Sequence, residues 1–283
     1  MMLTVVVPTR GRPRSLARCL AALARQEGCD PYEIVVADDT RAGDAAAGEL
    51  VARARGARLV RTGGAGAAAA RNAAVAAARG AHVLFTDDDC VPAPTWAARL
   101  RAALDGAGDV AGGRTENGVP GDPFVAASEA IRAHLEAWGR GHPHTRFIAS
   151  NNLGCVRELA LELPFDETYD GAGGEDRDWC ARAAARGARF AYVDDAVVVH
   201  EPQPGALRFL RQHVRYGRGA YRFASGGSRP GRLQEPRFYA ELLRRGFDEG
   251  VAAGLLVAAA QAATATGYVQ EALRSRAGRA PHH

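Results

Sequence analysis

Short apolar segments alternate with longer amphipathic segments in the first third of the chain. The short segments have the length of strands and lie at residues 3–7, 33–37, 57–61 and 81–86. The segments between them have helical spacing and lie at residues 13–26, 43–55 and 67–79. This alternation predicts a doubly wound, mostly parallel α/β sheet with right-handed crossovers. The near-continuous apolar strands indicate a sheet that is buried on both faces.

The pattern loosens after residue 92. We expect helices at residues 94–104, 124–138 and 176–186, and strands at residues 109–114, 147–150, 189–192 and 196–199. The tail from residue 204 is helical, with a break at residues 225–232. Its segment 251–269 is apolar but rich in alanine, which is typical of a packed or peripheral helix rather than a spanning one. We therefore expect an α/β domain over residues 1–220 and a helical C-terminal extension over residues 221–283.

Composition narrows the class of protein. The chain has 283 residues, of which 47% are hydrophobic and 24% charged, an ordinary globular balance. The net charge is +4 and the positive residues are all arginine; we interpret them as a solvated surface, so no nucleic-acid partner is expected. Five scattered cysteines without a CxxC pair argue against a disulfide framework and a zinc site. These features and the absence of a signal-peptide pattern predict a cytoplasmic protein, with peripheral membrane contact and a homodimer left open.

Three consecutive carboxylates follow the strand expected at residues 81–86. Asp87, Asp88 and Asp89 repel one another unless a cation lies among them. A hard divalent ion that also binds phosphate oxygens can supply that charge. Ligands of open α/β sheets bind at the carboxyl ends of the strands, which is where these residues are expected. An isolated acidic run is more often a solvated loop, so the surrounding residues decide.

Further polar residues are expected at the same edge. Asp38 and Asp39 end the second strand, and the turn Pro8-Thr9-Arg10 follows the first. Carboxylates can accept hydrogen bonds from a base or a ribose, and arginines, such as Arg71 in the helix at residues 67–79, can bind phosphate. The chain has neither GxGxxG nor a Walker lysine, which argues against a dinucleotide dehydrogenase and a P-loop NTPase.

A second acidic pair precedes the helix at residues 176–186. Glu175 and Asp176 follow two glycines, and alone they would be read as caps of the helix N-terminus. A capping loop is also a place where a base can be held rigidly. His200 ends the apolar run at residues 196–199; such a histidine is usually structural, but from a strand end it can reach a metal in the same crevice.

An ordered set of motifs spans residues 3 to 220. It comprises Val5-Val6-Val7-Pro8-Thr9-Arg10, Glu33-Ile34-Val35-Val36-Ala37-Asp38-Asp39, Ala70-Arg71-Asn72, Phe85-Thr86-Asp87-Asp88-Asp89-Cys90-Val91-Pro92, Ser150-Asn151-Asn152-Leu153, Pro164-Phe165-Asp166-Glu167, Gly174-Glu175-Asp176 and Val199-His200. In order and spacing this set resembles the inverting nucleotide-sugar glycosyltransferases of family 2. The resemblance implies a Rossmann-like GT-A fold.

For the donor, the resemblance implies that Asp38 or Asp39 holds the nucleobase and that Arg71 lies beside it. The turn Pro8-Thr9-Arg10 would border the same crevice. Gln212-His213-Val214-Arg215-Tyr216 is similar to a QxxRW motif with tyrosine in place of tryptophan, so Arg215 would approach the diphosphate. The tyrosine and the lack of flanking transmembrane helices put a processive polymerase in doubt.

For the metal, the resemblance implies that the run Asp87-Asp88-Asp89 is the DxD motif. Asp87 would lie nearer the ribose and Asp89 would bind Mn²⁺ or Mg²⁺, although which two of the three act stays open. His200 would complete the metal site, as a histidine does in some family members.

For catalysis, the resemblance implies that Asp176 is the general base, and Glu175 beside it can raise its pKa. Tyr216 would lie near the acceptor. The remaining expected acceptor contacts are Asn151, Asn152 and Trp179.

The expected reaction is metal-dependent, inverting transfer of a sugar from a nucleotide-diphosphate donor, a UDP sugar by preference, to a hydroxyl of a small-molecule, glycan or lipid-linked acceptor. A sugar nucleotidylyltransferase shares the fold class, but residues 8–14 match its glycine-rich loop poorly. A catalytically inactive nucleotide-sugar-binding domain is the second alternative. It is disfavoured because the metal and base positions are both filled.

Overall fold

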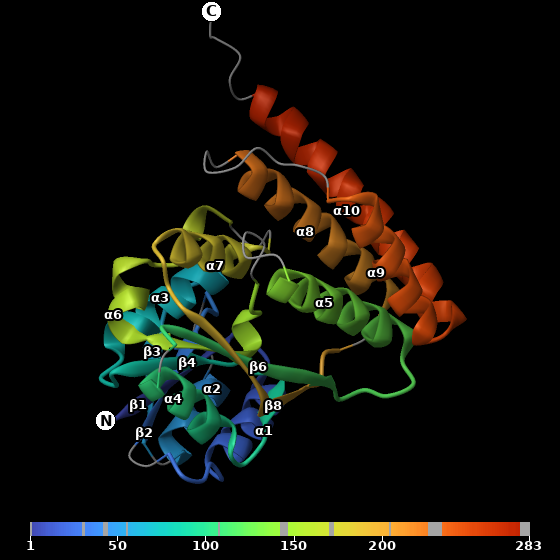
Figure 1. Ribbon diagram of the computed structural model, residues 1–283. Helices are drawn as coiled ribbons and strands as arrows, with labels where there is room; N and C mark the ends of the chain where they lie inside the picture. Colours follow the sequence, from blue (N-terminus) through green and yellow to red (C-terminus); the bar gives the residue numbers. More distant parts are fainter. Residues whose placement is uncertain are drawn as a thin grey trace, which may run out of the picture.

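The structure, a computed structural model, describes residues 2–29, 32–41, 45–54, 56–106, 108–141, 147–169, 173–203, 205–225 and 234–277. An α/β domain and a group of long C-terminal helices lie side by side (Figure 1). The strands are β1 (Leu3–Thr9), β2 (Tyr32–Asp38), β3 (Ala57–Arg61), β4 (His82–Phe85), β5 (Cys90–Pro92), β6 (Val110–Asn117), β7 (Leu153–Val156) and β8 (Phe190–His200). The helices are α1 (Pro13–Leu23), α2 (Ala45–Arg53), α3 (Ala67–Ala77), α4 (Trp96–Gly106), α5 (Pro123–Gly141), α6 (Arg157–Glu162), α7 (Glu175–Ala185), α8 (Ala206–Ser225), α9 (Pro236–Asp248) and α10 (Val251–Ala277).

The strands form one sheet in the order β3-β2-β1-β4-β7-β6-β8-β5. β1 runs parallel to β2 and β4, β2 parallel to β3, and β6 parallel to β8, whereas β7 is antiparallel to both of its neighbours and β5 antiparallel to β8. The register pairs Thr9 with Asp38, and Val6 with Phe85. The carboxyl ends of β1, β2 and β4 therefore lie at the same end of the sheet, as the sequence predicted.

Alternate residues of the central strands are buried on opposite faces. Val5 and Val7 pack in one cluster with side chains of α1, α2 and α4, whereas Val6 packs in another with side chains of α3, α6 and α7. All three valines are fully buried. Burial on both faces explains why these strands are apolar throughout rather than alternating. The predicted doubly wound α/β class is confirmed.

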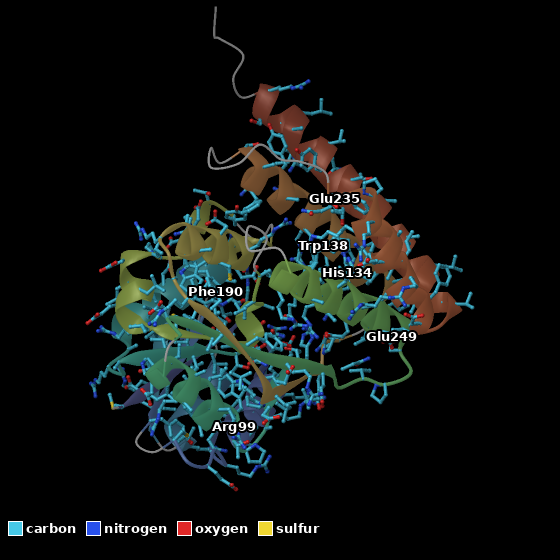
Figure 2. All side chains as sticks on the ribbon, viewed as in Figure 1. Arg99, His134, Trp138, Phe190, Glu235 and Glu249 are labelled. Carbon is cyan, nitrogen blue, oxygen red and sulfur yellow. The ribbon has the colours of Figure 1, made fainter. Side chains whose placement is uncertain are left out.

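A third apolar cluster joins α5, α8, α9 and α10, and includes Phe209, Phe238 and Val257. Figure 2 shows His134 and Trp138 on α5 beneath these helices. α8 and α10 approach closely at two glycines, because a Cβ at Gly217 would lie 1.9 Å from the Thr264 carbonyl oxygen. A Cβ at Gly267 would likewise lie 1.9 Å from the Val214 carbonyl oxygen.

Helix α10 contains the apolar segment expected at residues 251–269. By length and composition alone, Val251–Arg276 could cross a membrane. Its inner side chains, among them Ala253 and Ala260, are buried in the third cluster, while Leu255 and Val269 are exposed. The helix thus packs on its neighbours along one side, as the sequence indicated.

Several expected boundaries differ from the structure. The strand predicted at residues 147–150 is wrong: a 3-10 turn, Ser150–Asn152, precedes the actual strand β7. The two strands predicted at residues 189–192 and 196–199 are a single strand, β8, whose pairing with β6 shifts register. The break expected at residues 225–232 starts where α8 ends, but residues 226–233 lie outside the described part. α8 crosses residue 220, so the two-domain division stays a prediction.

Candidate active site

The acidic run after β4 pairs with two arginines from different elements. Arg71 on α3 donates from Nη2 to Asp87 Oδ1 at 2.9 Å. Arg12, just before α1, lies with Nη2 2.5 Å from Asp88 Oδ1 and donates from Nη1 to Asp89 Oδ2 at 2.7 Å. Arg12 was not among the site residues expected from the sequence. Its position in the turn after β1, at the carboxyl edge of the sheet, was the available signal.

Asp88 is the most buried member of the run, with no exposed surface. Thr9 donates to its Oδ2 at 2.6 Å, which fixes the turn after β1 against β4. Burial raises the pKa of Asp88 to about 6, although Arg12 and Thr9 both act to lower it. The structure therefore places Asp88 in a supporting position between the two strands.

Asp89 and His200 form the candidate metal centre. His200 Nε2 lies 3.6 Å from Asp89 Oδ1, while His200 Nδ1 lies 2.8 Å from Glu129 Oε1 on α5. Burial alone would lower the pKa of His200, but the Glu129 hydrogen bond and the charges of Asp89 and Glu129 raise it overall. The Cys90 sulfur lies within 4.8 Å of the other two ligand atoms, but burial raises the pKa of that thiol well above its ordinary value.

This donor set fits the expected ion. A carboxylate oxygen suits Mg²⁺ or Mn²⁺, and a neutral imidazole can add a nitrogen ligand. A carboxylate on the far nitrogen of a ligating histidine is a common means of fixing the ring and its tautomer, and Glu129 has that position relative to His200. Glu129 was not expected from the sequence, because it lies 71 residues from its partner on a helix with no acidic motif.

The carboxylates at the end of β2 organise the neighbouring loop. Asp39 accepts hydrogen bonds from the Thr62 hydroxyl at 2.8 Å, from the Gly64 N–H at 3.1 Å and from the Gly66 N–H at 3.1 Å. Arg10 Nη1 lies 3.7 Å from the same carboxylate. Asp38 is fully buried. Asp39 thus holds the glycine-rich loop that leads into α3 at the edge of the crevice.

Arg71 also connects the acidic run to α7. Its side chain is buried, and Nη1 donates to Glu175 Oε1 at 3.0 Å. Asp176 follows on the same helix and accepts hydrogen bonds from the backbone N–H groups of Ser150 at 3.3 Å and Arg177 at 2.8 Å. Burial, with the charge of Glu175 as the next cause, raises the pKa of Asp176 to about 7. A carboxylate with that pKa can accept a proton near neutral pH.

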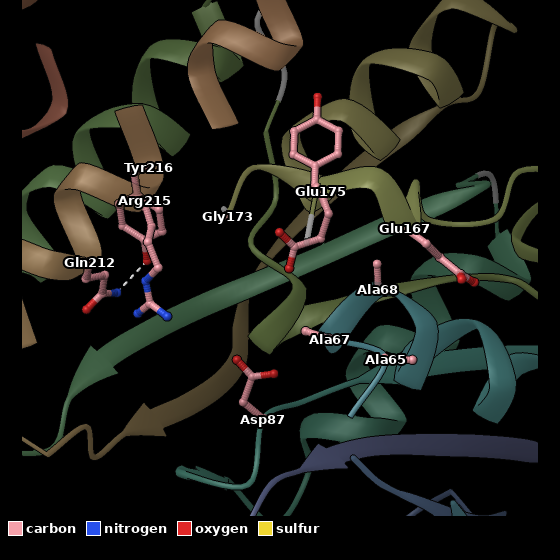
Figure 3. A pocket seen from close by; sticks show the side chains of 12 residues that line it. Ala65, Ala67, Ala68, Asp87, Glu167, Gly173, Glu175, Gln212, Arg215 and Tyr216 are labelled. Carbon is pink, nitrogen blue, oxygen red and sulfur yellow. Dashed lines mark hydrogen bonds between the residues drawn. The ribbon is translucent and has the colours of Figure 1, made fainter. Parts of the chain in front are cut away.

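A cavity of about 300 Å³ lies between α3, α7 and α8. Figure 3 shows Asp87 and Glu175 reaching it from one side, and Gln212, Arg215 and Tyr216 on α8 from the other. Glu175, rather than its neighbour Asp176, is the carboxylate of the pair that lines it. The volume is at the lower end of the range for small-molecule sites.

The expected acceptor residues are divided by the structure. Tyr216 is 42% exposed at the cavity. Asn151 is buried, and its Oδ1 has no hydrogen-bond partner among the described residues. Asn152 accepts from Trp96 Nε1 at 2.8 Å and donates to the Ala196 carbonyl at 3.0 Å.

Trp179 is fully buried and donates from Nε1 to the Leu163 carbonyl at 2.6 Å. Both Asn152 and Trp179 are therefore core residues whose polar atoms are already bonded within the protein. The acceptor contact expected for these two does not fit this placement.

Solved structures with the same fold include several glycosyltransferases. The mannosyltransferase PcManGT from Pyrobaculum calidifontis, in complex with GDP-Man and Mn²⁺, has a TM-score of 0.58 and 20% identity over 98% of this chain and 79% of its own. TarS from S. aureus in complex with UDP-GlcNAc has a TM-score of 0.56 and 16% identity, over 98% and 92% of the two chains. Glucosyl-3-phosphoglycerate synthase from Mycobacterium tuberculosis, in complex with phosphoglyceric acid, has a TM-score of 0.57 and 20% identity, over 81% of each chain.

The sequence comparison is consistent with this fold. Among curated proteins, none matches the chain. The family model described as glycosyl transferase family 2 matches residues 4–162, which is more than half of the sequence and covers the motifs from β1 to α6. The expected GT-A fold and family are thereby confirmed. The chain belongs to glycosyltransferase family 2.

Proposed function

We propose that this protein is a metal-dependent, inverting glycosyltransferase that transfers a sugar from a nucleotide-diphosphate donor, a UDP sugar by preference, to an acceptor hydroxyl. The observation that carries the proposal is the convergence of Asp87, Glu175 and Arg215, from three different elements, on one cavity at the carboxyl end of β4. The guanidinium of Arg215 on one side of the cavity fits a diphosphate, and Glu175 on the other side marks the start of α7, where the next residue is Asp176.

The metal position would serve the leaving group. Asp89 and His200 would hold Mn²⁺ or Mg²⁺, with Glu129 fixing the imidazole ring. Such an ion supplies Lewis-acid stabilisation of the departing nucleoside diphosphate. Arg215 would add a second positive charge on the α8 side of the diphosphate.

The nucleotide would lie along the ends of β1, β2 and β4. Asp38 or Asp39 would accept hydrogen bonds from the base, Arg71 would lie beside it, and the turn Pro8-Thr9-Arg10 would border it. Asp87 would contact the ribose. The individual roles are those that the family resemblance implies, and the register that pairs Thr9 with Asp38 at the ends of β1 and β2 supports this layout.

Asp176 would act as the general base. It would accept the proton of the acceptor hydroxyl as the hydroxyl oxygen forms a bond to the anomeric carbon, on the face opposite the breaking bond to the diphosphate. One base is sufficient for this displacement, which inverts the configuration. The raised pKa of Asp176 and the hydrogen bonds from Ser150 and Arg177 support this role because they give a positioned carboxylate that can take up a proton.

A ligand panel tests the proposal. The melting temperature would be measured with UDP-, GDP- and TDP-sugars, each with and without Mn²⁺, because a ligand that binds only the folded state raises it. We expect stabilisation by one donor class, dependent on Mn²⁺, and its loss in Asp89→Asn. Slow donor hydrolysis should release a nucleoside diphosphate. Release of inorganic diphosphate from an added nucleoside triphosphate and sugar 1-phosphate would instead indicate a nucleotidylyltransferase. No metal-dependent stabilisation by any donor would contradict the site.

A further inference from the structure

The outer face of α8 carries arginines whose charges are not compensated. Arg208, Arg211 and Arg215 lie on successive turns, and in the described part of the chain none of them forms an ion pair with a carboxylate. The next two arginines of the helix differ. Arg218 Nε lies 3.0 Å from Glu271 Oε2, and Arg222 Nη2 lies 2.8 Å from Glu271 Oε1. Positive charge is therefore left free only on the half of α8 that is next to the active site.

Apolar side chains lie between these arginines. Leu207 is 60% exposed and Leu210 is 41% exposed. With Val214 and the three arginines they line an open hollow of about 710 Å³. Arg215 lines both this hollow and the cavity between α3, α7 and α8, so the two are neighbours that share one side chain.

Exposed apolar side chains concentrate on the C-terminal helices. Nine large hydrophobic residues of the described chain are exposed, and eight of them belong to α8, α9 or α10. Surface leucines scattered singly are ordinary, but a concentration on one group of helices indicates an interaction surface. α10 adds Leu255 and Val269 on the side that faces away from the third apolar cluster.

We propose that this face of α8, formed by Leu207, Arg208, Leu210, Arg211 and Val214, docks on an anionic lipid surface. Leucines that enter the headgroup region and arginines that pair with lipid phosphates are the chemistry of an interfacial amphipathic helix. Because Arg215 borders both the hollow and the cavity, an acceptor carried by a lipid would approach the cavity from this side. This consequence for the acceptor rests on the proposed function, whereas the docking itself does not.

Other occupants fit the face less well. A second copy of the chain docking by two-fold symmetry would bring the same arginines together, which is electrostatically unfavourable. A single-stranded nucleic acid would be held by phosphate contacts and by stacking on aromatic rings. The residues that line the hollow are three aliphatic side chains and three arginines. An anionic lipid satisfies both kinds of side chain at once.

The test measures co-sedimentation of the full-length protein with vesicles of phosphatidylglycerol and, separately, of phosphatidylcholine, without donor. We expect binding to phosphatidylglycerol vesicles only, weakened by added salt. Arg208→Gln with Arg211→Gln should weaken it about 30-fold, since each arginine near an anionic surface contributes about 1 kcal/mol. The matched control is Arg25→Gln with Arg99→Gln, which removes the same charge from exposed positions. Figure 2 shows Arg99 far from α8.

A second variant separates charge from apolar insertion. Leu207→Ser with Leu210→Ser keeps every arginine and should also weaken vesicle binding, whereas a purely electrostatic contact would be unaffected by it and would contradict the proposal. Equal binding to both vesicle types, or equal binding by the arginine variant and its control, would also overturn it. So would displacement of the vesicles by single-stranded RNA, or a dimer that the arginine variant dissociates in sedimentation velocity. Donor-induced stabilisation, measured without vesicles, should be unchanged in both variants, so its failure in the wild type would count against the proposed function alone.

Discussion

Two arginine–carboxylate clusters flank the end of β4, and they differ in exposure. The Arg71 side chain is 5% exposed and joins Asp87 to Glu175, which connects three elements. The Arg12 side chain is 38% exposed and joins Asp88 to Asp89, which are neighbours in the chain. A buried guanidinium between fixed carboxylates is costly to remove and is part of the framework. A partly exposed guanidinium can break its ion pair and move into solvent at little cost. We infer that the Arg71 cluster supports the general base, Asp176. We also infer that Arg12 is a counter-ion that a metal can displace.

The largest expected effect is a loss of transfer rate when the general base is removed. Asp176→Asn should lower the rate of transfer about 10²–10⁴-fold, the usual contribution of a positioned general base, while donor-induced thermal stabilisation persists. In the wild type the rate should rise with pH up to about 7, because only the ionised form of Asp176 accepts a proton. The asparagine variant should lose that limb of the pH profile.

The control is Asp178→Asn on the same helix, whose carboxylate pairs with Arg182 at 2.6 Å. It should keep both the rate and the pH profile. Near wild-type turnover by Asp176→Asn would exclude this residue as the base and leave Glu175, which lines the cavity, as the carboxylate to test.

Removing the buried arginine should have the next largest effect, here on stability. Arg71→Met leaves Asp87 and Glu175 without their shared partner and should lower the free energy of unfolding by about 3–5 kcal/mol. Urea denaturation measures this change. Arg79→Met, at an exposed position just beyond the same helix, is the control and should alter the unfolding free energy little. Equal stability of the two variants would show that Arg71 is not part of the framework.

The hydrogen bond behind the metal position should have an intermediate effect. Glu129→Gln should weaken Mn²⁺ binding about 10- to 100-fold in calorimetry, because the carboxylate orients His200 and strengthens it as a ligand. Glu136→Gln removes the other carboxylate that pairs with Arg132 and serves as the control. If both variants weaken the metal equally, the effect comes from α5 as a whole and not from the His200 contact.

The exposed arginine should have the smallest effect, and the opposite sign. Arg12→Gln should tighten Mn²⁺ binding about two- to fivefold, since a partly exposed ion pair that competes with the metal contributes about 0.2–1 kcal/mol. Without metal, the same variant should melt at a lower temperature than the wild type. Arg10→Gln, two residues away and paired loosely with Asp39, should change neither quantity. Weaker Mn²⁺ binding by Arg12→Gln would mean that Arg12 helps to hold the metal site open.

The parts of the fold that sequence predicted well are those in which local pattern and tertiary burial agree. β1, β2 and β4 are apolar because both of their faces are covered, so their carboxyl ends, and the acidic residues there, could be located from sequence. The strand predicted at residues 147–150 was wrong because Ser150–Asn152 form a turn fixed by distant partners: Asn152 bonds to Trp96 and to the Ala196 carbonyl.

In the candidate site too, residues whose role depends on distant contacts could not be found from the sequence. Asp89 and His200 could be paired from their positions at strand ends alone. In the structure, His200 Nε2 lies 3.6 Å from Asp89 Oδ1. Glu129 could not be found, because its role depends on how α5 crosses the sheet, and a single glutamate in an amphipathic helix carries no local signal. Asp194 and Asp195 are exposed polar residues within β8, which explains why one strand was read as two.

The glycine contact between α8 and α10 has a consequence for the cavity wall. Gly217 immediately follows Arg215 and Tyr216, so the same turn of α8 that lines the cavity also rests on the backbone of α10. Even a single methyl group at Gly217 would force the two helices apart and would shift the guanidinium on the other side of that turn. Helix α10 thus fixes the position of the α8 wall of the cavity, although none of its own described side chains lines the cavity.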